Sequence, residues 1–343
     1  MASRHLVGLD VGSKFIKALQ LTESSGRYRV TEFGMAEVSP QVSVSDALQE
    51  LFSRKSFQTK RIVSAVSGRF VFVRYINMPV MTDEELVNAA KYELGKYIPV
   101  EVDEVLHDSQ KLEELAPQEG QEAEMRVLLV AAKRTFVDEH VAALETAGLQ
   151  PAIVDVDSFA LGNAYELAGT INAQAISAGK LVALVDIGAS KTNINIMSDA
   201  MSYFTREFYK GGDDLTDTLS KKLSMEAQEA ETLKRNPGGE LPKVQDCVAG
   251  VLDDICHDIN ISIDYFENQY DKKVEEIFVT GGSANCVGLQ ETLERTVQKP
   301  VNRWNPVQHL ELDLSQESAQ ELQDNGAQIS IALGLASRLR RED

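Results

Sequence analysis

The sequence predicts an α/β protein whose two lobes share one architecture. LVGLDVGSKFIKALQL at residues 6–21 and LVALVDIGASKTNINI at residues 181–196 each give an apolar run, an aspartate, a glycine, a small hydroxyl residue and a second strand-like run. That pattern is typical of two strands joined by a tight turn. In addition, 343 residues exceed what one ordinary core accommodates. Each copy of the pattern is therefore expected to open one lobe.

The first half continues as strands and one helix. The stretch RYRVTEFGMAEV follows the turn ESSG and predicts a third strand, and apolar spacing predicts a helix at 44–55. Strand-like runs at 61–68 and 70–78 then complete a first α/β unit.

The pattern changes at Thr82. Thr82 and Glu85 form a capping box, which predicts the start of a helix that ends before Pro99. EVLHDSQKLEE and MRVLLVAAKR read as strands, FVDEHVAALETAGLQ as an amphipathic helix that stops at Gly148, and PAIVDVD as a strand. Residues of about 80–150 are therefore expected to form an inserted module.

The second half repeats the opening. DSFALGNAYELAG predicts a helix before it, and AMSYFTREFY adds a third strand after it. GGDDLT begins helices, residues 244–270 predict one long helix, and EEIFVTGGSANCVGLQETLERTV reads as strand, glycine turn and helix. NGAQISIALGLASRL predicts a final helix.

Composition and charge narrow the classes of function. Lys and Arg number 34 against 53 Asp and Glu, and the net charge of −19 repels phosphate backbones, so we expect no nucleic-acid partner. No run approaches the ~18 apolar residues that span a bilayer, and no signal peptide is recognisable, which indicates a cytoplasmic protein without direct membrane insertion. The three cysteines form no CxxC pair and are expected as buried thiols.

The two turns suit phosphate and metal binding. A glycine at the tip of a turn lets the backbone approach an oxygen, because no Cβ intervenes, and two such turns can clamp a polyphosphate. Asp10 and Asp186 each end the first strand of a turn, where carboxylates hold a hydrated Mg²⁺. Other side chains nearby can bind phosphate oxygens or offset their charge: Ser13, Thr192, and Lys14 or Lys17.

Either turn alone is also typical of an ordinary β-hairpin. Their doubling changes the interpretation, and so does a Thr-Gly-Gly-Ser turn at 280–283 between a strand and a helix. Adjacent glycines there let a flat base and its ribose approach the backbone. Together the three turns predict a nucleotide site.

Five motifs carry a family resemblance: DVGSKFIK, DSFALGNAY, DIGASKT, TGGSA and ALGLASR. Together they resemble the actin-like ATPase superfamily, which includes actin, the seventy-kilodalton heat-shock chaperones, sugar kinases and FtsA. The resemblance covers nearly the whole chain. It implies a two-lobed, ribonuclease H-like fold that binds ATP and Mg²⁺.

The same resemblance implies roles for matching residues. Asp10 and Asp186 fall at the Mg²⁺ positions, and Asp157 falls where relatives place a residue that polarises the attacking water. The implied nucleotide-binding residues are Gly12, Ser13, Lys14, Lys17, Gly188, Ser190, Lys191, Thr192, Gly211, Gly212, Glu231, Lys234, Gly281, Gly282 and Ser283.

Two features leave alternatives open. Glu231 and Lys234 would equally suit an exposed charge pair on a helix. Ala189 and Ser190 stand where active ATPases usually carry Gly, or Asp with Gly, so that a Cβ crowds the loop that positions the water. ATP binding is therefore expected, with slow hydrolysis at most.

Two longer stretches, residues 78–108 and 127–161, resemble the PilM family of type IV pilus assembly proteins. This resemblance implies binding to the N-terminal cytoplasmic tail of the inner-membrane protein PilN, which would recruit the chain to the inner membrane beside other pilus proteins. Self-association is left open. FtsA relatives end in an amphipathic membrane helix, whereas this chain stops soon after its last expected helix, so we expect no membrane anchor of its own.

The resemblance also suggests a division into domains. The first lobe would comprise 1–80 and 152–180, with a final helix at 327–343 returning to it, and an FtsA/PilM-type inserted subdomain would occupy 81–151. The second lobe would comprise 181–213 and 273–326, with a helical subdomain at 214–272.

Two other functions remain open. One is an FtsA-like filament-forming cell-division or cytoskeletal protein, and the other is a small-molecule kinase with Asp213 or Asp214 as its base.

Overall fold

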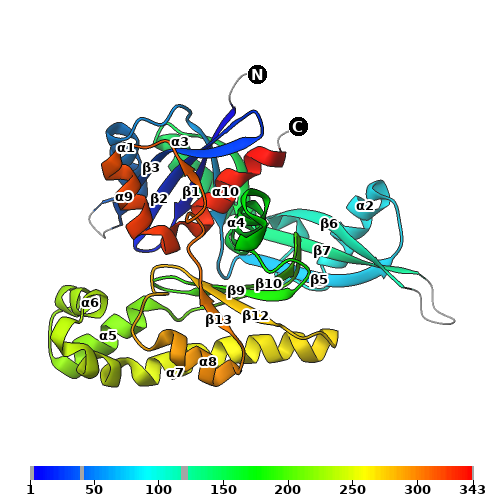
Figure 1. The fold of residues 1–343 in the computed structure, drawn as a ribbon. Coiled ribbons are helices and arrows are strands. Elements are labelled where there is room, and N and C mark those ends of the chain that lie inside the picture. The colour runs from blue at the N-terminus through cyan, green and yellow to red at the C-terminus, as the bar shows by residue number, and fades with distance from the viewer. Residues whose placement is uncertain (1–3, 39–41, 117–122, 342–343) are drawn as a thin grey trace. The chain divides into compact units, whose positions relative to one another are not determined.

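The computed structural model describes residues 4–38, 42–116 and 123–341. The chain divides into two compact units, one formed by residues 1–65 and 147–343 and the other by residues 66–146. The larger unit contains two sheets with their helices, which we call the first and second lobes (Figure 1).

The first lobe is built on the sheet with strand order β14-β3-β2-β1-β4-β8. The strands β1, β2 and β3 form an antiparallel meander, and β4 pairs with β1 in parallel. The strands are β1 Arg4–Val11, β2 Phe15–Ser24, β3 Arg27–Glu37, β4 Arg61–Val66, β8 Gln150–Val156 and β14 Glu311–Leu312, and the helices are α1 Val44–Arg54 and α9 Gln316–Asp324.

The second lobe repeats this plan in the order β11-β10-β9-β12-β13. Its first three strands are again antiparallel, and β12 then pairs in parallel with β9 and β13. The strands are β9 Leu181–Ile187, β10 Thr192–Ser198, β11 Met201–Phe208, β12 Glu276–Thr280 and β13 Val301–Arg303. The prediction of two lobes with one architecture is therefore confirmed.

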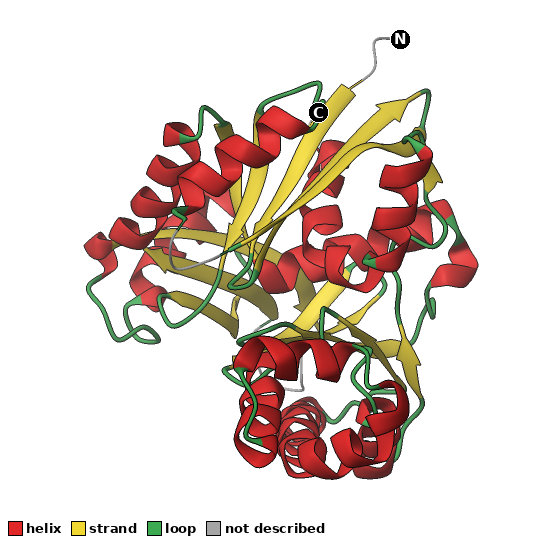
Figure 2. Ribbon diagram, turned by 90° about the vertical axis from the view of Figure 1, so that its left-hand side faces the viewer, coloured by secondary structure: helices red, strands yellow, loops and turns green. Residues whose placement is uncertain are grey.

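Four helices lie together on one face of the second sheet (Figures 1 and 2). They are α5 Gly212–Leu223, α6 Ala227–Arg235, α7 Leu241–Tyr270 and α8 Leu289–Val297. The long helix begins three residues before the predicted 244, because Pro242 fits a first helical turn, where its missing N–H costs no hydrogen bond.

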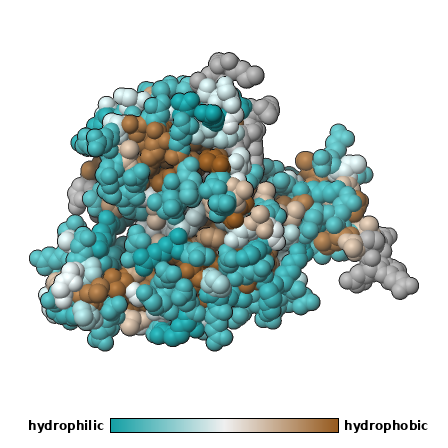
Figure 3. All heavy atoms as spheres, in the orientation of Figure 1, coloured by the Kyte–Doolittle hydropathy of each residue, from teal (hydrophilic) through white to brown (hydrophobic). Residues whose placement is uncertain are grey.

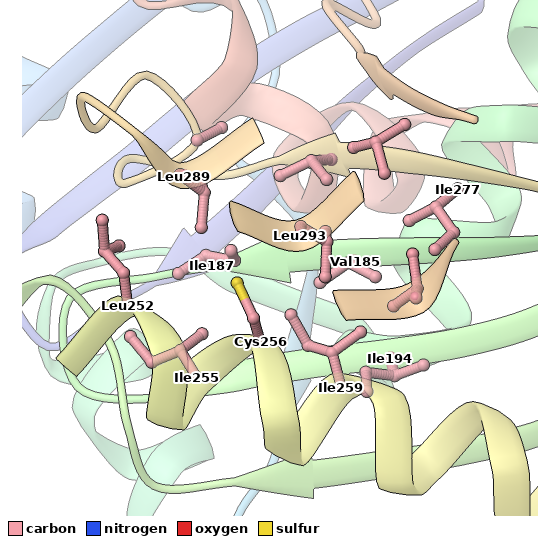
Figure 4. Close-up of a cluster of buried hydrophobic side chains, with 14 of the residues drawn as sticks. Val185, Ile187, Ile194, Leu252, Ile255, Cys256, Ile259, Ile277, Leu289 and Leu293 are labelled. Atoms are coloured by element: carbon pink, nitrogen blue, oxygen red, sulfur yellow. The ribbon is translucent and has the colours of Figure 1, made fainter. Parts of the chain in front are cut away.

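Strand β9 is buried on both faces, so alternate side chains enter different cores. Val185 and Ile187 contribute to the core beneath α7 and α8 (Figure 4), where the fully buried Cys256 also lies. Val182 and Leu184 contribute to the core around α4, Asp157–Ile171. The three cysteines are buried and unbridged, as predicted, and burial raises the pKa of Cys256 to about 12.

Two helices connect the lobes: α4 Asp157–Ile171 and α10 Ser330–Ala336. Their backbones approach so closely that a Cβ on Gly334 would lie 1.7 Å from the Ala160 carbonyl oxygen. On the other side, a Cβ on Gly8 of β1 would lie 1.9 Å from the Ala332 oxygen. Only glycine permits this packing.

The smaller unit holds the antiparallel sheet β5-β7-β6 with α2 and α3. Its elements are β5 Val71–Pro79, α2 Asp83–Leu94, β6 Val105–Leu115, β7 Glu124–Lys133 and α3 Arg134–Thr146. The Thr82 capping box is present, because Thr82 accepts the Glu85 N–H and Glu85 accepts the Thr82 N–H. The strand expected at 70–78 belongs to this sheet and not to the first α/β unit, since β5 pairs with β7 along its whole length.

The surface shown in Figure 3 is largely hydrophilic, with small hydrophobic areas. Within the described residues, no helix is both long and apolar enough to cross a bilayer.

Candidate functional site

The first turn joins β1 and β2. The Gly12 N–H donates to the Phe15 carbonyl at 3.1 Å, and a Cβ on Gly12 would lie 2.8 Å from that oxygen. Lys17 Nζ donates to Asp10 Oδ2 at 2.7 Å. This closed turn therefore places Ser13 and Lys14 at its tip, with Gly12 beside them.

The second turn joins β9 and β10 in the same way. The Gly188 N–H donates to the Lys191 carbonyl at 2.9 Å, which leaves Ala189 and Ser190 at the tip. Thr192 is fully buried, and its hydroxyl donates to the Lys210 carbonyl at 2.8 Å. This hydroxyl holds the following loop in place, a use that sequence reasoning did not foresee.

The structure brings the two turns together. The Ser190 hydroxyl donates to the Ser13 hydroxyl at 2.9 Å, although the two residues belong to different lobes. A second contact between the lobes joins Lys14 Nζ to Glu231 Oε2 at 3.1 Å. Four of the residues that the sequence assigns to the nucleotide, Ser13, Lys14, Ser190 and Glu231, therefore meet at the junction of the lobes.

The third turn packs against the second. Gly281 has φ +95°, and a Cβ there would lie 2.6 Å from Asp186 Oδ1. The Ser283 hydroxyl donates to the Gly188 carbonyl at 3.0 Å, and the Gly212 N–H donates to the same carbonyl at 2.9 Å. Three separate segments thus meet at the Gly188 carbonyl, through Gly188 itself, Gly212 and Ser283, which no local sequence pattern could specify.

The loop before α5 is equally tight. A Cβ on Gly211 would lie 2.6 Å from the Ala189 oxygen, and one on Gly212 would lie 2.3 Å from the Ser283 hydroxyl. Gly282 lies farther out, with Gln328 nearest to it. Asp214 Oδ2 accepts a hydrogen bond from the Gly211 N–H at 2.8 Å, so this carboxylate caps the N-terminus of α5. A carboxylate held in this way is poorly suited to act as the general base of a kinase.

Glu231 is the centre of a buried cluster of charges. It accepts hydrogen bonds from Lys234 at 2.7 Å, Arg235 at 2.7 Å and the Thr216 hydroxyl at 2.6 Å. Burial alone would raise the pKa of Glu231, but these donors outweigh it and hold the pKa well below its ordinary range. The alternative that Glu231 and Lys234 form an exposed charge pair on a helix is therefore excluded, because both side chains are largely buried. Sequence reasoning missed Thr216 and Arg235, although the spacing of four residues from Glu231 to Arg235 signals one of them.

Asp186 differs from Asp10 in its surroundings. Burial raises the pKa of Asp186 to about 6, with Lys17 opposing the rise and Asp10 adding to it. Lys17 itself is enclosed, and Asp10 raises its pKa despite burial.

The two aspartates suit a metal ion that takes other ligands as well. Among the described residues, no side chain forms a hydrogen bond or ion pair with Asp186, and no group of three acidic, His or Cys residues is placed to hold a metal ion. Two carboxylates completed by phosphate and water fit Mg²⁺, which keeps few protein ligands.

Asp157 begins α4 and faces a lysine. Lys191 Nζ donates to Asp157 Oδ2 at 2.8 Å and to Glu207 Oε2 at 3.1 Å. Sequence reasoning assigned Lys191 to the nucleotide and missed Glu207, because nothing in the sequence of β11 marks that residue as different from other acids.

A family model described as type IV pilus assembly protein PilM matches residues 8–341. The PilM-PilN type IV pilus biogenesis complex contains a chain that is 25% identical, with a TM-score of 0.82; the alignment covers 97% of this chain and 98% of that one. The ethanolamine utilization protein EutJ from Carboxydothermus hydrogenoformans is 14% identical, with a TM-score of 0.56 over 98% of this chain and 90% of that one.

Two further relatives extend the similarity to the actin-like fold. MreB 5 of Spiroplasma citri, solved bound to AMPPNP, is 12% identical with a TM-score of 0.51, over 98% of this chain and 96% of that one. The cell division protein FtsA of Streptococcus pneumoniae serotype 2 is 23% identical over 265 residues, which cover 68% of this chain and 56% of FtsA. The chain thus matches little more than half the length of that curated relative. The predicted actin-like α/β fold is confirmed.

Proposed function

Since this chain belongs to the family of the type IV pilus assembly protein PilM, we propose that it is an ATP-binding adaptor of pilus assembly that binds the N-terminal cytoplasmic tail of PilN. The observation that carries the partner is the TM-score of 0.82 with the chain in the PilM-PilN complex. An extended tail can be held by backbone pairing and apolar pockets. Such binding would keep the chain at the cytoplasmic face of the inner membrane.

The geometry of the three turns supports the nucleotide half of this proposal. Ser13 and Ser190 are in contact, and Gly281 allows the third turn to lie against Asp186. Asp10 and Asp186 would hold Mg²⁺, which would neutralise phosphate charge. The phosphates would lie against the turns that contain Gly12 and Gly188, where backbone N–H groups and small side chains leave room for oxygens.

The ribose and base would lie between α6 and the third turn. Glu231 and Lys234 would border that space, with the Lys234 ammonium held by Gly212, Thr216 and Glu231, and Gly282 and Ser283 offer backbone that a flat ring can approach. Lys14 would reach the nucleotide from the first lobe, beside Glu231.

Nucleotide would then act on the angle between the lobes. The Ser190 hydroxyl donates its proton to Ser13 in this arrangement, so it cannot donate the same proton to a phosphate oxygen. A phosphate that accepts from both hydroxyls therefore breaks this contact and changes how the lobes meet. A partner that prefers one arrangement would be bound more tightly in one nucleotide state than in another, by linkage.

Fluorescence anisotropy with a labelled peptide of the PilN N-terminal tail tests the partner, with a scrambled peptide as the control. We expect saturable binding of the native peptide alone, and a dissociation constant that changes at least severalfold when ATP and Mg²⁺ are added. Equal binding of both peptides would rule out the adaptor role. Electron microscopy with ATP separates it from a filament-forming protein.

A further inference from the structure

The Lys191 side chain points to a role other than phosphate binding. Its ammonium lies between the carboxylates of Asp157 and Glu207, at 2.8 Å and 3.1 Å. The exposed fractions of the three side chains are only 23%, 13% and 19%, so all three groups are largely enclosed. Two carboxylates thus share one lysine at the junction of α4 with β10 and β11.

This ammonium is firmly held. Burial alone would lower the pKa of Lys191, but Asp157 and Glu207 outweigh burial and raise the pKa above its ordinary value. Moving the ammonium elsewhere would leave two enclosed carboxylates facing each other without a counter-charge. Breaking one side of an enclosed ion pair is costly for that reason. Lys191 is therefore poorly suited to move onto an incoming phosphate.

Asp157 borders the place where the two turns meet. Its charge acts on Lys17 of the first turn and on Asp186 of the second. Asp10 and Asp186 are the candidates for the metal, so Asp157 is a further carboxylate near the two turns that is able to take a proton from water.

Hydrolysis of ATP would need such a group. The water oxygen forms a bond to the γ-phosphorus, and the bond from that phosphorus to the bridging oxygen breaks with its electron pair staying on ADP. The proton released by the water passes to a carboxylate and then to solvent. An ion-paired carboxylate is a weaker base, because the ammonium stabilises its charged form, and its paired oxygen is not directed at a water.

We propose that Lys191 restrains Asp157 and thereby slows ATP hydrolysis, so that this chain retains ATP and does not turn it over rapidly. The inference rests on the proposed ATP binding. It assigns Lys191 as a positioning residue that acts through Asp157, in place of a contact with phosphate.

The test compares K191M with wild type and with K180M. Lys180 pairs with Glu276 at the opposite end of β9 and serves as the matched control. Calorimetry gives the dissociation constant for ATP with Mg²⁺, and chromatography follows the conversion of bound ATP to ADP in a single turnover. We expect K191M to raise the conversion rate about tenfold or more, a part of the ~10²–10⁴-fold that general bases contribute, while the dissociation constant changes less than about threefold. K180M should change neither value.

Two further variants separate restraint from a merely structural role. K191R keeps the charge and should retain the slow rate, and K191M with D157N should lose the gain of K191M. Without nucleotide, K191M and D157N should each lower the melting temperature, and the double variant should lose less than their sum. K191Q replaces K191M in every comparison if K191M does not fold.

Three outcomes would overturn the inference. Weaker ATP binding by K191M without faster conversion would assign Lys191 to the phosphate. Normal ATP binding with an unchanged rate in K191M would show that Asp157 is not restrained by Lys191. Absence of ATP binding by the wild type would instead overturn the proposed function, and this inference with it.

Discussion

Replacing Gly334 by alanine should lower the free energy of unfolding by about 2 kcal/mol or more. The new methyl group would lie 1.7 Å from the Ala160 carbonyl oxygen and 2.5 Å from its carbon, whereas ordinary contacts begin at 3.4 Å. Both neighbours are backbone atoms of α4, so no side chain can rotate away and the helices must separate. Overpacking against backbone should cost about 3 kcal/mol or more of unfolding free energy. The better helix propensity of alanine offsets ~1 kcal/mol of that cost.

Urea unfolding followed by circular dichroism measures this loss. Gly250→Ala is the matched control, because Gly250 also lies in a helix, α7, and a methyl group added there would have no neighbouring heavy atom within 4 Å. That variant should gain about 0.5–1 kcal/mol from helix propensity alone. A Gly334→Ala protein as stable as wild type, or more stable, would refute the close packing of the two connecting helices.

Three other perturbations have definite expected results. Burial would raise the pKa of Glu267, but hydrogen bonds from Lys273 and Lys299 hold it below its ordinary 4.5, so its charged form stabilises the fold above that pH. The difference in unfolding free energy between wild type and Glu267→Gln should therefore shrink as the pH falls below 4.5, as urea titrations across pH would measure. Chelation of Mg²⁺ should weaken ATP binding about tenfold or more by calorimetry, since phosphate charge is then unshielded. Gly281→Ala should lower stability by about 1–3 kcal/mol in urea and abolish ATP binding, because φ +95° strains alanine and its methyl would meet Asp186.

The repeated halves could be predicted because their signals are local. A buried strand, a glycine turn and a second strand are written within about fifteen residues in each copy, and the capping box at Thr82 and the stop at Gly148 are equally local. The helix α3 indeed ends at Thr146, and Gly148 has φ +76°. Such signals located most elements to within a few residues.

Contacts between distant segments were not predictable in the same way. The strand expected at 70–78 has the same alternation of apolar and polar residues whichever sheet it joins. Only its pairing with β7 determines that it belongs to the sheet of the smaller unit. The contact of Lys14 with Glu231 depends on how the lobes meet. The pairing of Lys191 with Asp157 and Glu207 depends on how α4 packs against β10 and β11, so the sequence assigned Lys191 by position alone.

The most direct test of the account is a calorimetric titration of ATP and Mg²⁺ into the wild type and into a variant with Asp10→Asn and Asp186→Asn. The wild type should bind one ATP per chain, and the variant should bind about 100-fold more weakly or not at all, because both carboxylates that we propose as metal ligands have lost their charge. Melting temperatures without nucleotide would establish that the variant is folded. Equal binding by the two proteins, or no binding by the wild type, would contradict the claim that the paired turns form one nucleotide site.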